Sequence, residues 1–273
     1  PFKRKRDAVD IVSNNEKKRG WLVGSTSLRF DDGLDVTLSK SRLNKSQYQA
    51  AHKALCATDF CCIHGPPGTG KTRTLVEIVR SACEDGLRVL AVSHSNQAVD
   101  NLLVGDSSET HVDQSSIHGL VSSTEITAAR VGRNSSNNLV EEEYVGNDLY
   151  QSDVVCATMS GAHRFGEDIF DLAVIDEATQ ASIPASLIPV TRAKRVVLAG
   201  DHKQLPPYSS GEHSDDEEMS LSLFDHLVER YGREVVSTLK TQYRMNEEIA
   251  AFPNEAFYNG ELEHGSQNRD WSI

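Results

Sequence analysis

The chain has 273 residues and a formal net charge of −12, with 38% hydrophobic and 25% charged residues. These values are typical of a soluble globular protein with one large domain, or with one domain and a small appendage. The acidic balance argues against a nonspecific basic coat for nucleic acid, and no apolar run approaches the roughly 18–20 residues that cross a membrane.

Residues 1–40 differ in pattern from the rest of the chain. They hold basic clusters at residues 3–6 and 17–19, followed by two alternating runs at 21–30 and 34–38 that are separated by an Asp-Asp-Gly turn signal. We interpret this part as the end of a small N-terminal β accessory element. Solvated surface is the first interpretation of the basic clusters, and contact with phosphates or a localisation signal is the alternative.

A phosphate-binding loop follows a short apolar run. Residues 65–72 read Gly-Pro-Pro-Gly-Thr-Gly-Lys-Thr, preceded by a run typical of a buried strand and followed by apolar residues at helical spacing. Glycines let backbone N–H groups turn inward, and the start of a helix adds partial positive charge, so this order of elements builds a polyphosphate cradle. We expect Lys71 to reach the β- and γ-phosphates and Thr72 to bind Mg²⁺. The residues expected to bind the nucleotide here are Gly65, Pro66, Pro67, Gly68, Thr69, Gly70, Lys71 and Thr72.

From residue 43 onward, strand-like runs alternate with helical stretches. Several of these runs are almost continuously apolar, as expected for a parallel sheet covered on both faces. The expected strands are residues 60–64, 88–93, 128–131, 153–157, 172–175, 195–199 and 235–239. The expected helices are residues 47–57, 72–83, 97–104, 221–231 and 247–252. The sequence therefore predicts an α/β fold with a mostly parallel sheet flanked by helices.

Two stretches interrupt this alternation. Residues 105–127 and 134–148 have weak periodicity, and we interpret residues 105–148 as an insertion. Residues 209–218 hold five carboxylates and are predicted to be a solvated loop.

The five cysteines are predicted to be reduced thiols, because an odd number without a C-x-x-C pair does not indicate a disulfide framework. Such thiols are typical of a cytoplasmic, reducing environment. Neighbouring side chains of a strand point to opposite faces, so Cys61, Cys62 and His64 are not expected to converge on a metal ion.

An apolar run at residues 172–175 ends in two carboxylates, Asp176 and Glu177. In phosphate-loop enzymes, an acid at such a strand end holds Mg²⁺. A second acid beside it can orient and deprotonate the attacking water. Surface charge is the alternative for such a pair, but the phosphate loop earlier in the chain favours catalysis. We expect Asp176 to bind the metal and Glu177 to act as the general base.

Two further polar side chains follow predicted strands. Gln204 lies after a glycine turn, where its amide can hydrogen-bond a γ-phosphate and respond to its loss. Arg244 lies between a strand and a helix, and its guanidinium can form two hydrogen bonds with the γ-phosphate. A salt bridge at the helix start is the alternative for Arg244.

The order of these segments resembles the motifs of superfamily 1 helicases, and more narrowly those of the branch of the nonsense-mediated-decay helicase and senataxin. The segments that carry the resemblance are residues 65–72, 176–180, 200–207 and 242–245. Three others agree: residues 43–47 are similar to the adenine-reading glutamine motif, 93–100 to the first nucleic-acid motif, and 154–158 to a strand-end motif that touches the nucleic-acid backbone. The resemblance covers about residues 41–265.

The resemblance implies that residues 41–273 form a RecA-like phosphate-loop domain. Such a domain binds ATP and Mg²⁺ and couples ATP hydrolysis to 5′→3′ movement along single-stranded RNA or DNA. By the same resemblance, Gln47 would read adenine and Tyr243 would stack on it. The residues implied to hold nucleic-acid phosphates or to shape the channel floor are Ser95, Asn96, Thr158, Pro206 and Pro207. Groups that hold phosphates position a strand without reading its sequence, so RNA and DNA both stay open.

Active members of this family close ATP between two RecA-like domains. No second series of phosphate-side strands precedes Ile273, so we expect the second domain, with its own arginine, in a longer protein. An arginine supplied in this way can be worth 10³–10⁵ in kcat, which predicts weak hydrolysis by this chain alone. A stand-alone ATP-binding regulatory module without unwinding activity is the alternative. A small-molecule kinase is less favoured, because it would not need Gln204 and Arg244.

Overall fold

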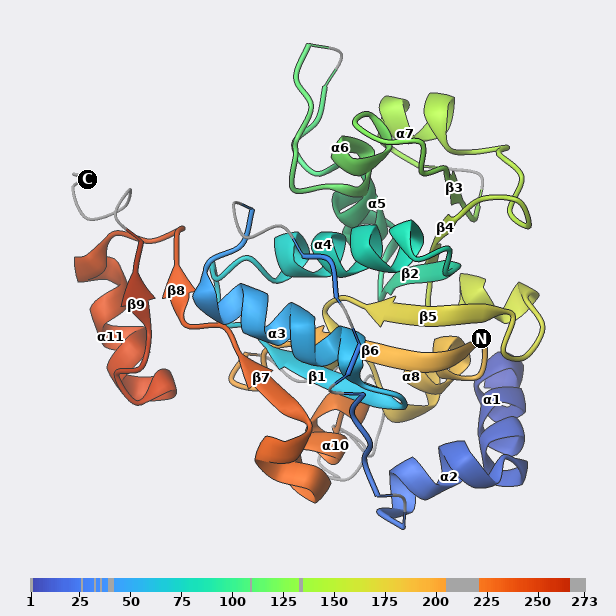
Figure 1. Ribbon diagram of the computed structural model, residues 1–273, viewed down its shortest axis with the longest axis horizontal. Helices are drawn as coiled ribbons and strands as arrows, with labels where there is room; N and C mark the ends of the chain where they lie inside the picture. Colours follow the sequence, from blue (N-terminus) through green and yellow to red (C-terminus); the bar gives the residue numbers. More distant parts are fainter. Residues whose placement is uncertain are drawn as a thin grey trace.

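The computed structural model describes residues 2–25, 27–31, 33–34, 36–38, 42–108, 110–132, 135–204 and 221–265. Its described part contains one seven-stranded parallel sheet with helices on both faces (Figure 1). The strands are β1 (Phe60–His64), β2 (Val89–Ser93), β3 (Ala128–Arg130), β4 (Val154–Thr158), β5 (Phe170–Ile175), β6 (Ala193–Gly200) and β7 (Val236–Thr238). Their spatial order is β3-β4-β2-β5-β6-β1-β7. The predicted α/β fold with a parallel sheet is confirmed.

Two helical layers cover the sheet. One contains α3 (Lys45–Cys56), α4 (Lys71–Glu84), α5 (Asn96–Val104), α6 (Ile117–Val121) and α7 (Asn138–Glu143). The other contains α1 (Phe2–Asn14), α2 (Glu16–Val23), α8 (Ile183–Val190) and α10 (Leu223–Tyr231). Short 3₁₀ helices lie at η1 (Gly161–Arg164), η2 (Ala178–Gln180) and η3 (Gly232–Glu234). After β7, the pair β8 (Thr241–Gln242) and β9 (Glu263–His264) flanks α11 (Glu247–Tyr258).

Side chains of the central strands alternate between the two layers. In β1, Cys61 and Ile63 pack with the α3, α4 and α5 layer, whereas Phe60 and Cys62 pack with the layer of α1, α2, α8 and α10. Because both faces are covered, every residue of β1 and β2 is buried, which explains the continuous apolar runs of the sequence.

The parallel arrangement brings the loops that carry the polar motifs to one edge of the sheet. His64 at the end of β1 is in register with Gly200 of β6, and Ile175 of β5 with Leu198 of β6. In open α/β sheets, the ligand lies at the carboxyl ends of the strands. The site is therefore expected where β1, β5 and β6 end.

The N-terminal part contradicts the predicted β element. Residues 2–23 form α1 and α2, and the described residues of 24–40 contain a single β interaction, an isolated bridge between Phe30 and Ala57. Helix α2 begins at its N-cap Asn15, whose side chain accepts a hydrogen bond from Lys18 N, and it ends at Gly24 with φ 71°. These capping signals outweigh the alternating pattern that starts at residue 21.

The predicted insertion at residues 105–148 is not continuous. Helices α6 and α7 lie outside the sheet, but β3 lies between them in sequence and pairs with β4 as an edge strand of the main sheet. The predicted strand at residues 128–131 is therefore found, within an otherwise helical and irregular segment. Residues 205–220 fall outside the described residues, so the roles expected for Pro206, Pro207 and the acidic stretch at 209–218 stay predictions.

The five cysteines are free thiols, and burial raises the pKa of the Cys61 and Cys156 thiols to about 12. A thiol with so high a pKa stays protonated and unreactive. Among the described residues, no group of three or more His, Cys, Asp or Glu could hold a metal ion. None of the described helices has both the length and the apolar character of a membrane span.

Candidate functional site

The loop between β1 and α4 has the backbone of a phosphate cradle. Gly68 and Gly70 have φ values of 74° and 79°, which glycine adopts without strain. A Cβ added at Gly65 would lie 2.2 Å from Lys71 Cγ, and one at Gly68 would lie 2.5 Å from Arg244 Cβ. The glycines therefore serve both the turn and the close packing of two cationic side chains on the loop.

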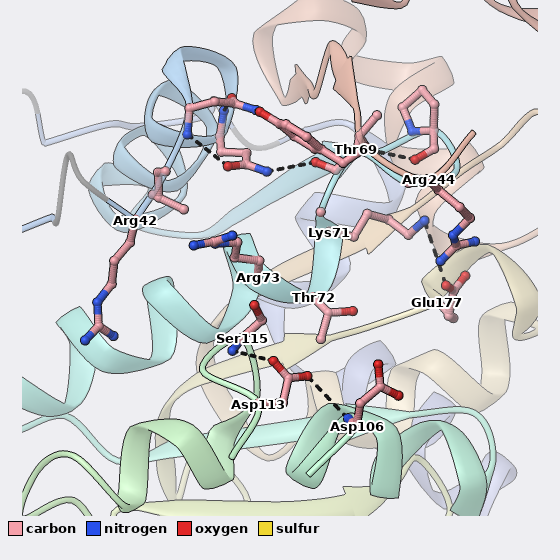
Figure 2. Close-up of a pocket in the computed structure, with 17 residues that line it drawn as sticks. Arg42, Thr69, Lys71, Thr72, Arg73, Asp106, Asp113, Ser115, Glu177 and Arg244 are labelled. Carbon is pink, nitrogen blue, oxygen red and sulfur yellow. Dashed lines mark hydrogen bonds and ion pairs between the residues drawn. The ribbon is translucent and has the colours of Figure 1, made fainter. Parts of the chain in front are cut away.

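Four predicted residues meet beside this loop. Lys71 and Thr72 begin α4, whereas Asp176 and Glu177 directly follow β5. Lys71 Nζ donates a hydrogen bond to the carbonyl of Gly65 over 2.9 Å. It also lies 3.8 Å from Glu177 Oε1, as Figure 2 shows. Thr72 Oγ1 donates to Asp176 Oδ2 over 3.3 Å. The structure thus brings together a cation, a hydroxyl and two carboxylates at the start of one helix.

Asp176 is buried, with only 6% of the residue exposed. Burial, and next the charge of Glu177, raise the pKa of Asp176 to about 6, although Lys71 and the hydrogen bonds from Glu177 N and Thr72 favour its charged form. A hydroxyl and a buried carboxylate are oxygen donors of the kind that Mg²⁺ prefers, and a divalent cation would stabilise the charge that burial disfavours. The residues therefore fit the magnesium ion expected with ATP.

The adenine-side residues Gln47 and Tyr243 are tied to the phosphate loop. Gln47 is 3% exposed, and its Oε1 and backbone N–H complete a capping box with Asn44 at the start of α3. Gln47 Nε2 donates to the carbonyl of Thr69 over 2.9 Å. Tyr243 N donates to Gly68 O over 2.8 Å, and its hydroxyl accepts from Asn44 Nδ2 over 3.0 Å. Both ends of the Gln47 amide are thus engaged with protein atoms, so base reading by Gln47 stays a prediction.

Together these groups line a cavity of about 870 Å³, which is large enough for a nucleotide. Five of its lining residues were not singled out from the sequence: Arg42, Arg73, Asp106, Asp113 and Ser115. Figure 2 shows the last three on the segment that leads from α5 to α6. Arg73 follows Thr72 directly and could have been found, but the approach of the segment after α5 depends on the tertiary fold and has no local signal.

Arg244 lines this cavity, whereas Gln204 is not among its described lining residues. Arg244 N donates to Gln242 Oε1 over 3.0 Å, which fixes the backbone after β8. Gln204 Nε2 instead donates to Asp201 Oδ2 over 2.8 Å. The amide expected at the γ-phosphate is therefore held by a neighbouring carboxylate.

Asp201 joins three parts of the molecule. Its carboxylate is 1% exposed and accepts hydrogen bonds from Lys203 N, Gln204 Nε2 and Tyr258 OH, and His64 Nε2 lies 3.0 Å from Oδ1. Burial by itself would raise the pKa of Asp201, but the hydrogen bonds of His64, Tyr258 and the others outweigh burial and hold the pKa well below its usual range. The carboxylate links the end of β1, the segment of Gln204 and α11. Its position directly after an apolar strand was the available sequence signal.

The three residues expected at a nucleic-acid strand lie at the ends of adjacent strands β2 and β4. Ser95 caps α5 by accepting from Ala98 N over 3.1 Å. Asn96 Oδ1 accepts from an Arg130 side chain over 3.1 Å, and Thr158 Oγ1 accepts from Gly161 N over 3.0 Å. Short polar side chains therefore stand on the same sheet edge as the phosphate loop, and their nucleic-acid role stays a prediction.

Two sequence models of the AAA domain family match the chain. One matches residues 42–145 and 137–210, more than half of the chain, and the other matches residues 219–272. The matched residues include the phosphate loop, both carboxylates after β5 and Arg244.

Curated relatives are similar over most of this chain. The DNA-binding protein SMUBP-2 of Rattus norvegicus is 34% identical over 88% of the chain and 30% of its own length. An uncharacterized ATP-dependent helicase of Methanocaldococcus jannaschii is 31% identical over 96% of the chain and 52% of its own length. The DNA replication ATP-dependent helicase/nuclease DNA2 of Gallus gallus is 36% identical over 98% of the chain and 28% of its own length. The chain thus spans about half, or less, of the length of these relatives.

The fold is also similar to solved structures. The crystal structure of the Arterivirus nonstructural protein 10 helicase aligns with a TM-score of 0.51 at 16% identity, over 84% of this chain and 47% of that one. The complex of an Arterivirus nonstructural protein 10 helicase with DNA aligns with a TM-score of 0.50 at 16% identity, over 84% and 48%. At this identity the likeness concerns the fold alone.

Proposed function

Because the chain belongs to the superfamily 1 helicases, in the branch of the nonsense-mediated-decay helicase and senataxin, we propose that it is the first RecA-like, ATP-binding motor domain of a nucleic-acid helicase. The convergence of Lys71, Thr72, Asp176 and Glu177 around the glycine loop carries this proposal. These four groups supply the cation, the metal ligands and the base that ATP hydrolysis needs.

The contacts of Lys71 suggest how nucleotide binding prepares the base. In the structure the ammonium lies between the Gly65 carbonyl and the Glu177 carboxylate. Phosphate oxygens would attract it more strongly than a single carbonyl, because they carry full negative charge. Lys71 would then turn toward the phosphates and leave Glu177 free to orient a water molecule. Thr72 and Asp176 would hold Mg²⁺, which neutralises charge on the phosphates when bound.

We further propose that Gln204 couples the phosphate state to movement. Its amide is held by Asp201, whose carboxylate also accepts from Tyr258 on α11. If the Gln204 amide bonded a γ-phosphate instead, Asp201 would lose one hydrogen bond. The contact between Asp201 and Tyr258 of α11 would then change. Arg244, on the loop that precedes α11, would contact the same phosphate with its guanidinium.

The partners follow from the family and remain proposals for this chain. We propose that it acts with a second RecA-like domain on single-stranded DNA or RNA, moves 5′→3′, and works in a reducing, intracellular compartment, in keeping with its five free thiols. The relatives' names refer to DNA binding and to ATP-dependent helicases, which supports a nucleic-acid partner.

The test is a titration of a fluorescent ATP analogue with Mg²⁺ against four proteins. Lys71→Ala removes the charge from the phosphate site and should weaken binding by about tenfold to a hundredfold, as for the loss of a charge-assisted hydrogen bond of about 1.5–3 kcal/mol. Glu177→Gln, which keeps size and hydrogen bonding, should bind like the unmodified chain. Lys194→Ala, an exposed lysine at the amino end of β6, is the matched control. Equal affinities of Lys71→Ala and the unmodified chain would refute the assignment.

A further inference from the structure

The basic cluster at residues 3–6 lies at the start of α1, which packs beside α8 (Figure 1). Ala8 and Val12 are the buried residues of α1, and a spacing of four places Arg4 on the same helix face. The Arg4 side chain therefore lies against the rest of the protein, although it is exposed to solvent. Its Nη1 donates to the carbonyl and to the hydroxyl of Ser160, over 3.2 and 2.9 Å.

A cavity of about 440 Å³ opens at this contact. Its lining residues are Arg4, Val131, Ser160, Gly161, His163 and Arg164. Gly161 forms part of it, and a Cβ there would lie 3.1 Å from Thr158 Oγ1 and 3.4 Å from Val131 Cγ1. Because Gly161 N also donates to Thr158 Oγ1, the cavity adjoins the residue proposed to hold a nucleic-acid phosphate.

The charges around this cavity are mostly positive. Arg4 and Arg164 are exposed guanidinium groups, and the nearby acidic group is Asp7, whose Oδ2 lies 3.4 Å from His163 Nε2. Burial, and next the charges of Arg192 and Arg4, lower the pKa of His163, and Lys3 acts in the same direction. Buried His163 Nδ1 has no hydrogen-bond partner within the described part of the chain. Although the protein has a net charge of −12, the positive side chains around this cavity would attract an anion.

We propose that Arg4, Ser160 and Arg164 form a contact site for backbone phosphates of a single nucleic-acid strand, next to Thr158. The inference rests on the proposed function. Guanidinium and hydroxyl groups are the ones that contact phosphate oxygens without reading bases. Continuity with Thr158, on the sheet edge that also carries Ser95 and Asn96, favours nucleic acid over any other phosphate-bearing partner. Arg4 of helix α1 would thus extend the nucleic-acid contact surface beyond Ser95, Asn96 and Thr158.

The test compares the salt dependence of single-strand binding. Arg4→Gln/Arg164→Gln in the 273-residue chain removes two charges, and fluorescence anisotropy is measured with labelled oligo(dT) and oligo(U) over a potassium chloride series. For single strands, each lost phosphate contact lowers the slope of log K against log salt by about 0.7, so we expect a decrease of about 1.4. The matched control is Lys194→Gln/Arg233→Gln, two exposed cations near the amino ends of strands β6 and β7, which should keep the slope.

Two further variants separate charge from folding. Arg4→Lys/Arg164→Lys keeps both charges and should retain the slope, and the exposed single change Arg164→Gln should lower it by about 0.7 while leaving the melting temperature unchanged. Equal losses for DNA and RNA are expected, and a loss confined to RNA would overturn a phosphate site. If the unmodified chain binds both strands and Arg4→Gln/Arg164→Gln has the same slope, this inference fails while the proposed function stands. If the unmodified chain binds neither strand, both fail.

Discussion

Two buried aspartates follow neighbouring strands and have opposite pKa shifts. The pKa of Asp176, after β5, is raised to about 6 by burial and by Glu177. The pKa of Asp201, after β6, is lowered, because its hydrogen-bond donors outweigh burial. The difference separates their roles. The charge of Asp176 is only partly compensated by its neighbours, which suits a cation ligand, whereas Asp201 accepts enough hydrogen bonds to suit the positioning of Gln204 and Tyr258.

We expect Asp176→Asn to stabilise the nucleotide-free protein near neutral pH. A carboxyl whose pKa is raised by folding binds its proton more tightly in the folded state, so the stability of the protein falls as pH rises from about 4 to above 6. Raising the pKa from 3.8 to about 6 corresponds to at most about 3 kcal/mol in the free energy of unfolding at pH 7.5. The melting temperature in EDTA should therefore be higher for the variant at pH 7.5, and the difference between the two proteins should be much smaller at pH 4.5. A variant that melts lower at both pH values would contradict this account of Asp176.

Asp201→Asn should act in the opposite direction. Because folding lowers this pKa, the charged carboxylate contributes stability above its unfolded pKa of about 3.9, and that stability is lost as pH falls through the lower folded pKa. Losing hydrogen bonds to a charged group should reduce the free energy of unfolding at pH 7 by about 2 kcal/mol or more, as measured in urea. Tyr258→Phe removes one of these bonds to the charged carboxylate and should cost about 1.5–3 kcal/mol. Unchanged stability of Asp201→Asn would show that the carboxylate does not hold these segments.

For individual residues, the sequence predicted which side chains lie at the site better than it predicted their hydrogen-bond partners. Lys71, Thr72, Asp176 and Glu177 were expected together because a local motif and a strand end position each of them. Gln204 was expected at a phosphate but bonds Asp201, because that choice of partner depends on a tertiary neighbour with no local signal.

At the level of helices and loops, the site is held together by hydrogen bonds between loops and the first turns of helices. The capping box of α3 positions Gln47 against the Thr69 carbonyl, and Tyr243 N binds Gly68 O from the loop after β8. The phosphate loop is thus held by α3 on one side and by the Arg244 loop on the other. This explains why residues distant in sequence line a single cavity.

Gly68→Ala tests this packing against a matched glycine. Gly68 and Gly86 have almost equal positive φ values, 74° and 75°, but a Cβ at Gly68 would lie 2.5 Å from Arg244 Cβ, whereas none of the described atoms lies within 4 Å of a Cβ at Gly86. Gly86→Ala should cost about 1 kcal/mol of stability through backbone strain alone and leave ATP affinity unchanged. Gly68→Ala should in addition displace Arg244 and weaken ATP binding. Equal affinities of the two variants for a fluorescent ATP analogue would contradict the packing.

The elements themselves were predictable where burial dictates the pattern. Continuous apolar runs marked the central strands, since both faces of the sheet are covered. The alternating pattern of residues 21–30 predicted a strand. In the structure, Trp21, Leu22 and Val23 instead form the end of α2, and Trp21 packs on Phe60. So short a helix is decided by its caps and its tertiary contact rather than by its periodicity.

At the scale of the whole molecule, the parallel sheet brings the described motifs that follow β1, β2, β4, β5 and β6 to one edge. The candidate nucleotide site lies at the ends of strands β1, β5 and β6. The residues proposed to contact nucleic acid follow the adjacent strands β2 and β4. Only a few strand ends therefore separate the candidate nucleotide site from the residues proposed to contact nucleic acid. With a net charge of −12, we expect nucleic-acid binding to depend on local groups rather than on the overall charge.

We propose that this chain is one half of an ATP-driven motor. The most direct measurement is ATP hydrolysis, with and without single strands, together with separation of a tailed duplex, by the 273-residue chain and by a longer chain that includes the proposed second RecA-like domain. We predict that the short chain binds ATP, hydrolyses it slowly and separates nothing. The longer chain should hydrolyse ATP with stimulation by single strands, and Glu177→Gln in it should lower kcat by about 10²–10⁴. Robust strand separation by the 273-residue chain alone, or hydrolysis in the longer chain that ignores single strands, would contradict the claim.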